Sequence, residues 1–451
     1  MSVLFNNPLL GASGQGPSAD LGDTIEQSLR FGGVSGQKLV GSSAIAVDDT
    51  YTLSFWYKHT HNTTRFRGSI FTNDGDYPYL SFNADNGGYS GLEIYNGSAY
   101  VLYPPNGIGS FRQLRDPSAW LHCVIAQVNS TSFTIYINGE QAFQSTSQQM
   151  DWSNFALGGH PTNQYICDGM IAQLYHIDGT ALTPTSFGKY NEDGVWVPQD
   201  YTGTYGTNGF HLTFDSSQAN GIGHDSSGNG NHFTASGFDT TAISSSNPDN
   251  DVDFNDTPTS NYATLNPLGG PNLATPIDAN LTGTNTSATW TNSNVFNTVA
   301  MTTGRWYWEV TVKDWSGDLM LGIGNYDATV ENSTSYIGST VNGWAYYSTG
   351  NKYNNNGFTA YGDSWNNTST FPTIGFAFDA DTKTIWASKN GVWQGSATLA
   401  EIEAGTTTNS MFTGMNGTQW FPAVSVLGTA KGAINFGQMP FIYTQPSGFN
   451  A

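Results

Sequence analysis

The chain has 451 residues, more than a single hydrophobic core usually serves, so two domains are expected. Its 35 Asp and Glu residues outnumber 14 Lys and Arg, and the formal net charge of −21 argues against binding nucleic acid or anionic lipid through a basic patch. The composition is rich in Gly, Asn, Thr and aromatic residues and has no long helical period, which predicts an all-β protein.

Residues 1–27 are polar and glycine-rich apart from two short apolar groups, and they predict an N-terminal arm. The first residues lack the basic region and the long apolar run of an export signal. No later run approaches the roughly 20 apolar residues of a membrane span. We therefore expect neither export through a signal peptide nor membrane insertion.

A strand pattern begins at residue 28. Tyr51, Leu53, Phe55 and Tyr57 occupy every second position of an extended segment, which places these four large side chains on one face. The positions between them carry Thr52, Ser54, Trp56 and Lys58. The pattern predicts a β-sandwich over residues 28–199. Further strands are expected at 68–71, 79–82, 92–95, 120–128, 132–137 and 171–177, and Thr183-Pro184 predicts a short helix over 185–190.

Cys123 and Cys167 are the two cysteines, and each lies in an apolar run. A disulfide scaffold is therefore not expected, and two buried thiols are the simplest interpretation. A bridge between them is the alternative, because their separation in space cannot be read from the sequence.

The blocks SLRF, YTLSFWYK, WLHCVIAQ, FTIYINGE and DGMIAQLYHIDG follow one another between residues 25 and 190. In this order they resemble the laminin-G-like, concanavalin A-like domain, which implies a jelly roll of antiparallel strands. The longer string at residues 181–214, ALTPTSFGKYNEDGVWVPQDYTGTYGTNGFHLTF, resembles segments of structural proteins from tailed bacteriophages, particularly marine ones.

Residues 200–288 are dense in Gly, Asn, Asp, Ser and Pro and predict a connector. One alternating run, Phe210, Leu212 and Phe214, predicts a small hairpin within it. Residues 224–237 resemble the opening loop of many laminin-G-like repeats, so part of the connector is expected to pack on one of the sandwiches.

The strongest strand pattern of the chain lies at residues 371–394, within a second predicted sandwich over 289–451. Ile374, Phe376 and Phe378 share one face, and Asn390-Gly391 suits the positive φ angles of a tight hairpin turn. This stretch, with the blocks at 306–310, 321–324, 421–424 and 435–437, resembles the SPRY family in sequence and order, which implies an antiparallel β-sandwich.

Acidic loops suggest a site for Ca²⁺, which prefers closely spaced oxygen ligands. The candidate ligands are Asn73, Asp74 and Asp76 around a glycine, together with Asp168. A plain β-turn is the alternative at residues 73–76. Asp225, Asn229 and Asn231 form a comparable cluster.

A ligand is expected to meet exposed aromatic rings near the rims of the sandwiches, because ring faces stack on sugars and Asn or Asp bond hydroxyl groups. The alternative for each ring is a place in the core. The candidate contact residues are Tyr77, Tyr79, Trp344, Tyr346, Tyr353, Tyr361 and Trp365.

Catalysis is not expected. Glu401-Ile402-Glu403 lacks the third carboxylate of the strand motif that glycosidases of this fold use, and it predicts a short helix or loop. Gly362-Asp363-Ser364 has no histidine partner motif after it, and no metal-binding His or Cys spacing is present.

The composition is typical of surfaces that work outside cells, yet no export signal is visible. A bacteriophage virion protein, assembled in the host cytoplasm and released by lysis, reconciles the two. We therefore predict a non-enzymatic virion structural protein with a host-facing role, such as a fibre or spike that recognises glycan or protein. The expected partners are other virion proteins, host surface glycan or protein, and further copies of the chain. A capsid or tail accessory protein that binds only its virion neighbours, and a polysaccharide-depolymerising enzyme, are the alternatives.

Overall fold

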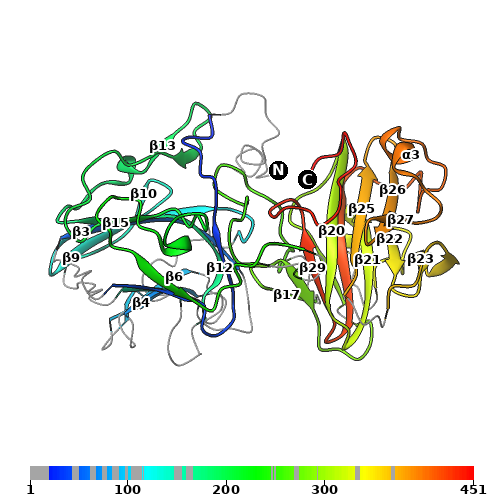
Figure 1. Ribbon diagram of the computed structural model, residues 1–451, viewed down its shortest axis with the longest axis horizontal. Helices are drawn as coiled ribbons and strands as arrows, with labels where there is room; N and C mark the ends of the chain where they lie inside the picture. The colour runs from blue at the N-terminus through cyan, green and yellow to red at the C-terminus, as the bar shows by residue number, and fades with distance from the viewer. Residues whose placement is uncertain are drawn as a thin grey trace. The chain divides into compact units, whose positions relative to one another are not determined.

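The computed structural model describes most of the chain. The described residues are 20–42, 50–60, 68–73, 79–83, 91–96, 100–102, 114, 116–146, 155–158, 166–244, 247, 250–268, 274–291, 293–330, 336–366 and 371–451. They divide into two compact units, and the regular elements of each unit are almost all β-strands (Figure 1). The prediction of an all-β protein with two tandem antiparallel β-sandwiches is confirmed.

The first unit has two antiparallel sheets. One has the strand order β1-β12-β3-β8-β9-β10, with β15 beside β12, and the other has the order β16-β2-β11-β4-β5-β6-β7. The bounds are β1 Leu29–Gly32, β2 Lys38–Gly41, β3 Tyr51–His59, β4 Gly68–Asn73, β5 Tyr79–Asn83, β6 Gly91–Tyr95, β7 Tyr100–Leu102, β8 Leu121–Asn129, β9 Ser132–Ile137, β10 Glu140–Ser145, β11 Phe155–Gly158, β12 Asp168–Asp178, β15 Phe210–Leu212 and β16 Phe233–Ser236.

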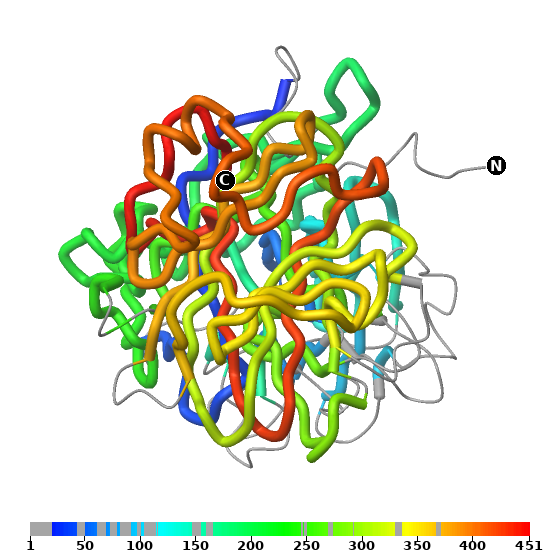
Figure 2. The backbone as a smooth tube through the Cα atoms, turned by 90° about the vertical axis from the view of Figure 1, so that its right-hand side faces the viewer, coloured from blue at the N-terminus to red at the C-terminus, as the bar shows by residue number. Residues whose placement is uncertain are grey.

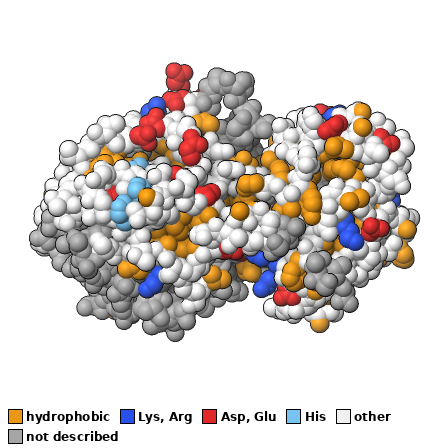
Figure 3. Space-filling view, in the orientation of Figure 1, with side chains coloured by type: hydrophobic (Ala, Val, Ile, Leu, Met, Phe, Trp, Pro, Cys, Tyr) orange, Lys and Arg blue, Asp and Glu red, His pale blue; other side chains and the backbone are white. Residues whose placement is uncertain are grey.

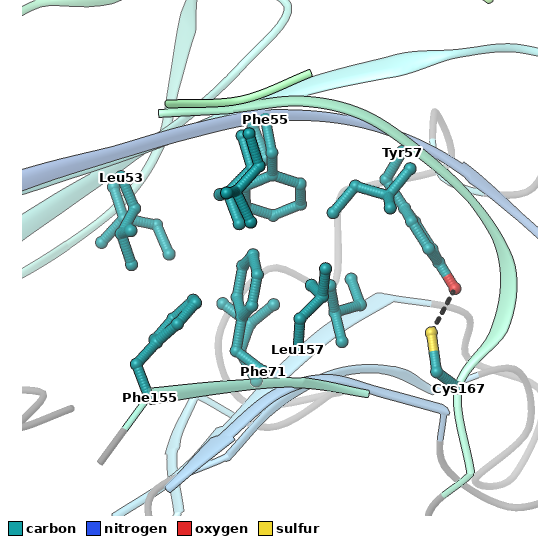
Figure 4. Packing of buried hydrophobic residues seen from close by; sticks show 14 of the residues in the cluster. Leu53, Phe55, Tyr57, Phe71, Phe155, Leu157 and Cys167 are labelled. Atoms are coloured by element: carbon teal, nitrogen blue, oxygen red, sulfur yellow. Dashed lines mark hydrogen bonds between the residues drawn. The ribbon is translucent and has the colours of Figure 1, made fainter. Parts of the chain in front are cut away.

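The core of the first unit lies between these sheets. Leu53, Phe55 and Tyr57 of β3 point toward Phe71 and residues of β11, as their alternation predicts (Figure 4). The Phe55 and Phe71 rings meet edge to face, with centroids 4.7 Å apart. Cys123 and Cys167 are free buried thiols, and burial raises the pKa of both. No disulfide joins them.

The opposite face of the first sheet is covered by the segment that follows β12. The predicted helix over 185–190 is wrong: a single 3-10 turn, η3 at Pro184–Ser186, is followed by β13 Gly188–Tyr190, which pairs with β14 Trp196–Pro198. The strand pairing is favoured because Gly188 lets the Trp196 ring approach closely. A Cβ at Gly188 would lie 2.6 Å from that ring.

The predicted connector contributes strands to both units. β15 and β16 extend the two sheets of the first unit, and Asp251–Tyr262 also belongs to that unit. Arg30 pairs with Asp251, and Lys58 pairs with Asp256, so two buried ion pairs hold this segment in place. Thr241–Asn250 and Ala263–Ala451 form the second unit.

The second unit also has two sheets, ordered β17-β18-β29-β20-β25-β26-β27 and β19-β28-β21-β22-β23-β24. The yellow segment of β22 to β24 lies toward the viewer in Figure 2. The bounds are β17 Thr275–Ile277, β18 Thr282–Thr284, β19 Asn294–Phe296, β20 Arg305–Asp314, β21 Gly317–Asn325, β22 Gly343–Tyr347, β23 Asn351–Asn354, β24 Gly357–Ala360, β25 Thr373–Asp379, β26 Thr384–Lys389, β27 Val392–Trp393, β28 Trp420–Gly428 and β29 Lys431–Asn435.

The Asn390-Gly391 turn joins β26 to β27 as predicted, with φ angles of 49° and 76°. The two α-helices among the described residues are short: α2 at Tyr326–Val330 and α3 at Leu399–Glu403. No helix in these residues has the length and apolar character to span a membrane.

Candidate functional site

The predicted calcium ligands lie in two places. Asp74 and Asp76, like Tyr77, lie outside the described residues, and Asn73 is the last residue of β4. Asp168 is buried at the start of β12, where its backbone carbonyl accepts a 2.8 Å hydrogen bond from the Tyr57 hydroxyl. Within the described ranges no group of three His, Cys, Asp or Glu residues could hold a metal ion. Calcium binding at residues 73–76 stays a prediction.

Asp225 holds its own loop together, and metal binding at this cluster stays a prediction. Asp225 Oδ1 accepts hydrogen bonds from the backbone N–H groups of His211 and Ser227, both at 2.9 Å, and Oδ2 accepts one from Asn231 at 2.8 Å. Both carboxylate oxygens are therefore occupied by the chain's own donors.

The prediction that Trp344, Tyr346 and Trp365 contact a ligand is wrong, because these three side chains form part of the hydrophobic core. Trp344 and Tyr346 alternate on the inner face of β22, and Trp365 packs on Tyr346 with ring centroids 5.9 Å apart. All three are buried, so they offer no ring face to a ligand. Tyr361 packs beside the same core, and its hydroxyl accepts a 3.3 Å hydrogen bond from the Ala387 backbone.

Tyr79 is also buried, but it belongs to a polar side of the first unit. In β5 and β6 the apolar side chains point into the core and the alternate positions carry polar ones. In β4 the register shifts between Ser69 and Phe71, so Ile70 and Phe71 both lie in the core between the polar Ser69 and Thr72. The strand registers place Ser69 opposite Ser81 and Ser81 opposite Glu93. Beside that row, Thr72 lies opposite Tyr79 and Tyr79 opposite Tyr95. We call these six residues the polar face: Ser69, Thr72, Tyr79, Ser81, Glu93 and Tyr95.

Three hydroxyls of the polar face are buried without a partner. The side-chain oxygens of Ser69, Thr72 and Ser81 have no hydrogen-bond partner in the described part of the chain, and each residue is 0% exposed. A buried hydroxyl without a hydrogen bond costs about 1–3 kcal/mol. Three such groups on adjacent strands leave hydrogen-bonding capacity that the described chain does not use.

An acidic and aromatic group completes the face. The Tyr79 hydroxyl donates a 2.8 Å hydrogen bond to Glu93 Oε1, and the Tyr79 and Tyr95 rings stack with centroids 5.6 Å apart. Tyr95 is half-buried, so this end of the face reaches solvent. The arrangement offers hydroxyl donors and acceptors, one carboxylate and a ring stack, which are the groups that recognise a polyhydroxylated molecule.

Sequence reasoning named Tyr79 but missed the rest of the polar face. Polar residues alternate with apolar ones in YLSF and LEIY, and this pattern could be read from the sequence. In SIFT the pattern is broken, because two apolar residues separate Ser69 from Thr72 where the strand register shifts. The sequence does not show that the three strands are neighbours, and only this order brings the serines of separate strands into one row.

Replacing Ser81 with alanine should leave the free energy of unfolding unchanged or raise it by about 1 kcal/mol, because an unpartnered buried hydroxyl is removed. The matched control is Ser54→Ala. Ser54 Oγ lies 2.8 Å from His122 Nε2, so its loss should destabilise the protein by about 1 kcal/mol. Calorimetric unfolding of the intact protein measures both. A loss in Ser81→Ala equal to that in Ser54→Ala would show that the Ser81 hydroxyl is structural.

Comparison with known families finds one match in each of the two units. Residues 31–186 match the model of the concanavalin A-like lectin/glucanases superfamily, and residues 305–439 match that of the SPRY domain. The chain carries a concanavalin A-like domain followed by a SPRY domain. The first sandwich is therefore the concanavalin A-like domain and the second the SPRY domain. No curated protein matches the chain.

Several solved structures are similar to parts of the chain. The SPRY domain of human HERC1 has 16% sequence identity and a TM-score of 0.26, and the match covers 36% of this chain and 91% of that one. A Bacteroides ovatus protein for which carbohydrate binding has been suggested has 15% identity and a TM-score of 0.34, covering 48% and 59%. Domain 4 of the Geobacillus stearothermophilus arabinanase AbnA, in complex with arabinotriose, has 22% identity and a TM-score of 0.26, covering 35% and 72%. At these values no function is transferred from them.

The carboxylates considered for catalysis serve the SPRY domain's own structure. Glu401 forms a capping box with Thr398 at the start of α3, and Glu403 accepts a 2.8 Å hydrogen bond from the Ser447 backbone. Ser364 Oγ donates to the side-chain oxygen of Asn366 at 2.7 Å. None of these interactions pairs a nucleophile with a base.

Proposed function

We propose that this protein is a non-enzymatic carbohydrate-binding protein, and that the concanavalin A-like domain holds its sugar on the polar face. The observation that carries the proposal is the set of three buried hydroxyls without partners, Ser69, Thr72 and Ser81. All three residues are 0% exposed, so a sugar would reach them only through a local opening of the polar face beside Tyr95. There its hydroxyls, which donate and accept at once, would satisfy groups that the chain leaves unpaired.

The charges favour a neutral sugar. Glu93 is the one acidic residue in the described strands of this sheet, and a carboxylate disfavours an anionic ligand. On the face of the molecule in Figure 3, Lys and Arg side chains are scattered rather than gathered in a basic patch. The Tyr95 ring at the open end supplies the surface on which a sugar stacks.

The number of carboxylates on these strands supports sugar binding without hydrolysis of the sugar. Glycoside hydrolases need two carboxyl groups about 5–10 Å apart, one as acid and one as nucleophile or base. The described strands of the polar face supply Glu93 alone, and its Oε1 already accepts the Tyr79 hydroxyl. We therefore propose that the site is not catalytic.

A glycan array tests the proposal. The intact protein is expected to bind neutral glycans, and the Ser69→Ala/Ser81→Ala variant is expected to bind them about tenfold more weakly, since a few hydrogen bonds of about 0.5–1.5 kcal/mol each are lost. Ser54→Ala, on the other sheet, is the control and should keep the wild-type pattern. Equal binding by the double variant and the wild type would contradict the assignment of the site.

We also propose that the protein works on a bacteriophage virion as a host-facing element, in contact with other virion proteins and further copies of itself. The support is the resemblance of residues 181–214 to phage structural proteins and the acidic composition. Mass spectrometry of purified particles should recover the protein. Its absence from particles, with the protein present in the infected cell, would contradict this part.

A further inference from the structure

The outer face of the six-stranded SPRY sheet carries a group of aromatic rings that lie outside the buried core. Tyr347 of β22 and Tyr353 of β23 are half-buried, and Phe358 of β24 is 63% exposed. Trp290 and Tyr336, also half-buried, reach the same place from loops. We call these five residues the aromatic surface: Trp290, Tyr336, Tyr347, Tyr353 and Phe358.

The rings of the aromatic surface touch one another in a closed circuit. Trp290 contacts Tyr336 and Tyr347 with centroids 5.5 and 6.1 Å apart. Tyr353 contacts Tyr336 and Tyr347 at 5.9 and 5.6 Å, and each of these four contacts is edge to face. Phe358 stacks on Tyr353 at 5.3 Å with an interplanar angle of 24°. Mutual packing therefore fixes the orientation of every ring before a ligand arrives.

The backbone beneath the rings is also ordered. β23 and β24 are joined by Asn355-Asn356, whose φ angles of 53° and 58° are those of a two-residue hairpin turn, and Tyr353 lies directly opposite Phe358. The half-buried rings rest on buried apolar residues, among them Phe296, Met320 and Ile337. A ligand would consequently lose little free energy to ordering of the protein.

The polar groups of the surface lie at the edges of the rings. The Tyr336 hydroxyl donates to Asn356 Oδ1 and the Tyr347 hydroxyl to Asp318 Oδ2, both at 2.6 Å, so both hydroxyl groups already have partners within the chain. None of the five residues carries a charge, and the chain as a whole is strongly acidic.

We propose that the aromatic surface is a second carbohydrate-binding site, which takes a neutral polysaccharide. Fixed ring faces stack on the apolar faces of sugar rings, while an indole N–H and the exposed amides of Asn355 and Asn356 reach hydroxyl groups. The absence of basic residues from the five disfavours an acidic polymer.

Affinity electrophoresis of the intact protein tests this assignment with five neutral probes: dextran, pullulan, galactomannan, arabinoxylan and hydroxyethylcellulose. At least one polymer is expected to retard the wild type. Tyr353→Ala/Phe358→Ala should weaken retardation by that polymer about tenfold, the loss expected for two stacking contacts of about 0.5–1.5 kcal/mol each. Phe371→Ala, which removes a ring that is 48% exposed elsewhere in the domain, should leave it unchanged.

Two further variants separate a loss of binding from a failure to fold, and the aromatic surface from the polar face. Phe358→Ser alone alters a mainly exposed ring, so it should fold even if the double variant does not, and it should still weaken binding. Ser69→Ala/Ser81→Ala should keep the retardation that depends on the aromatic surface, which separates this site from the polar face. Retardation by none of the polymers, or equal retardation of Phe358→Ser and wild type, would overturn the proposal. Capture of a peptide by this surface in place of any polysaccharide would also overturn it.

Discussion

Replacing Asp256 with alanine is expected to destabilise the concanavalin A-like domain by about 3–5 kcal/mol, because it leaves the buried Lys58 ammonium without its counter-ion. Lys58 Nζ lies 2.7 Å from Asp256 Oδ2, and both side chains are almost completely buried. Burial lowers the pKa of Lys58 and raises that of Asp256. The remaining partners, Asn261 Oδ1 and the Tyr262 carbonyl, cannot neutralise the charge.

Scanning calorimetry of the intact protein measures this loss as a lower transition temperature for the first domain. Asp20→Ala is the matched control, because the Asp20 and Lys189 pair is 3.1 Å long but half-exposed, and its removal should leave the transition unchanged. The Lys58→Met/Asp256→Leu variant should recover most of the stability, since it removes both charges. An Asp256→Ala loss below about 1 kcal/mol would show that residues 251–262 are not anchored by this pair.

Acidification from pH 6.5 to about 4 should destabilise the concanavalin A-like domain strongly. Burial lowers the pKa of His122 to about 3 and the pKa values of His176 and His211 to about 4, below the ordinary value of 6.5. In this pH window these histidines bind protons in the unfolded chain but stay neutral in the folded domain. The folding stability is therefore present above pH 6.5 and is lost as the pH falls. A lowering from 6.5 to about 4 corresponds to about 3 kcal/mol for each such histidine.

One buried carboxyl of this domain acts in the opposite direction. Burial raises the pKa of Asp256, and its protonation in the folded state would offset part of the loss. The histidine contribution is isolated by His122→Asn, which should reduce the slope of unfolding free energy against pH by about one proton between pH 6.5 and 4. Urea unfolding at a series of pH values measures the slope. An unchanged slope in this variant would contradict the assignment of a neutral buried His122.

Local patterns were enough to predict the architecture. The alternation of Leu53, Phe55 and Tyr57 and the Asn390-Gly391 turn are written in adjacent residues, and the structure contains both as expected. The route of the chain was harder to predict. Asp251–Tyr262 belongs to the first unit because Lys58 pairs with Asp256, which lies 198 positions away in the sequence. The residues next to Lys58 and Asp256 in the sequence give no sign of this pairing.

The candidate sites show the same limit. Alternation divides β22 into two faces, but it does not say which face meets the other sheet, and the prediction chose the buried Trp344 and Tyr346. Tyr353, named for the same reason, lies on the outer face. The polar face depends on the order β4-β5-β6, in which serines from separate strands become neighbours.

Titration of the intact protein with a glycan that it binds on an array, followed by mass spectrometry of the same glycan, tests the central claim most directly. The account predicts saturable binding that weakens in Ser69→Ala/Ser81→Ala and a glycan recovered at its original length after prolonged incubation. Shortened glycan, or full binding by the variant with unpartnered hydroxyls removed, would contradict it.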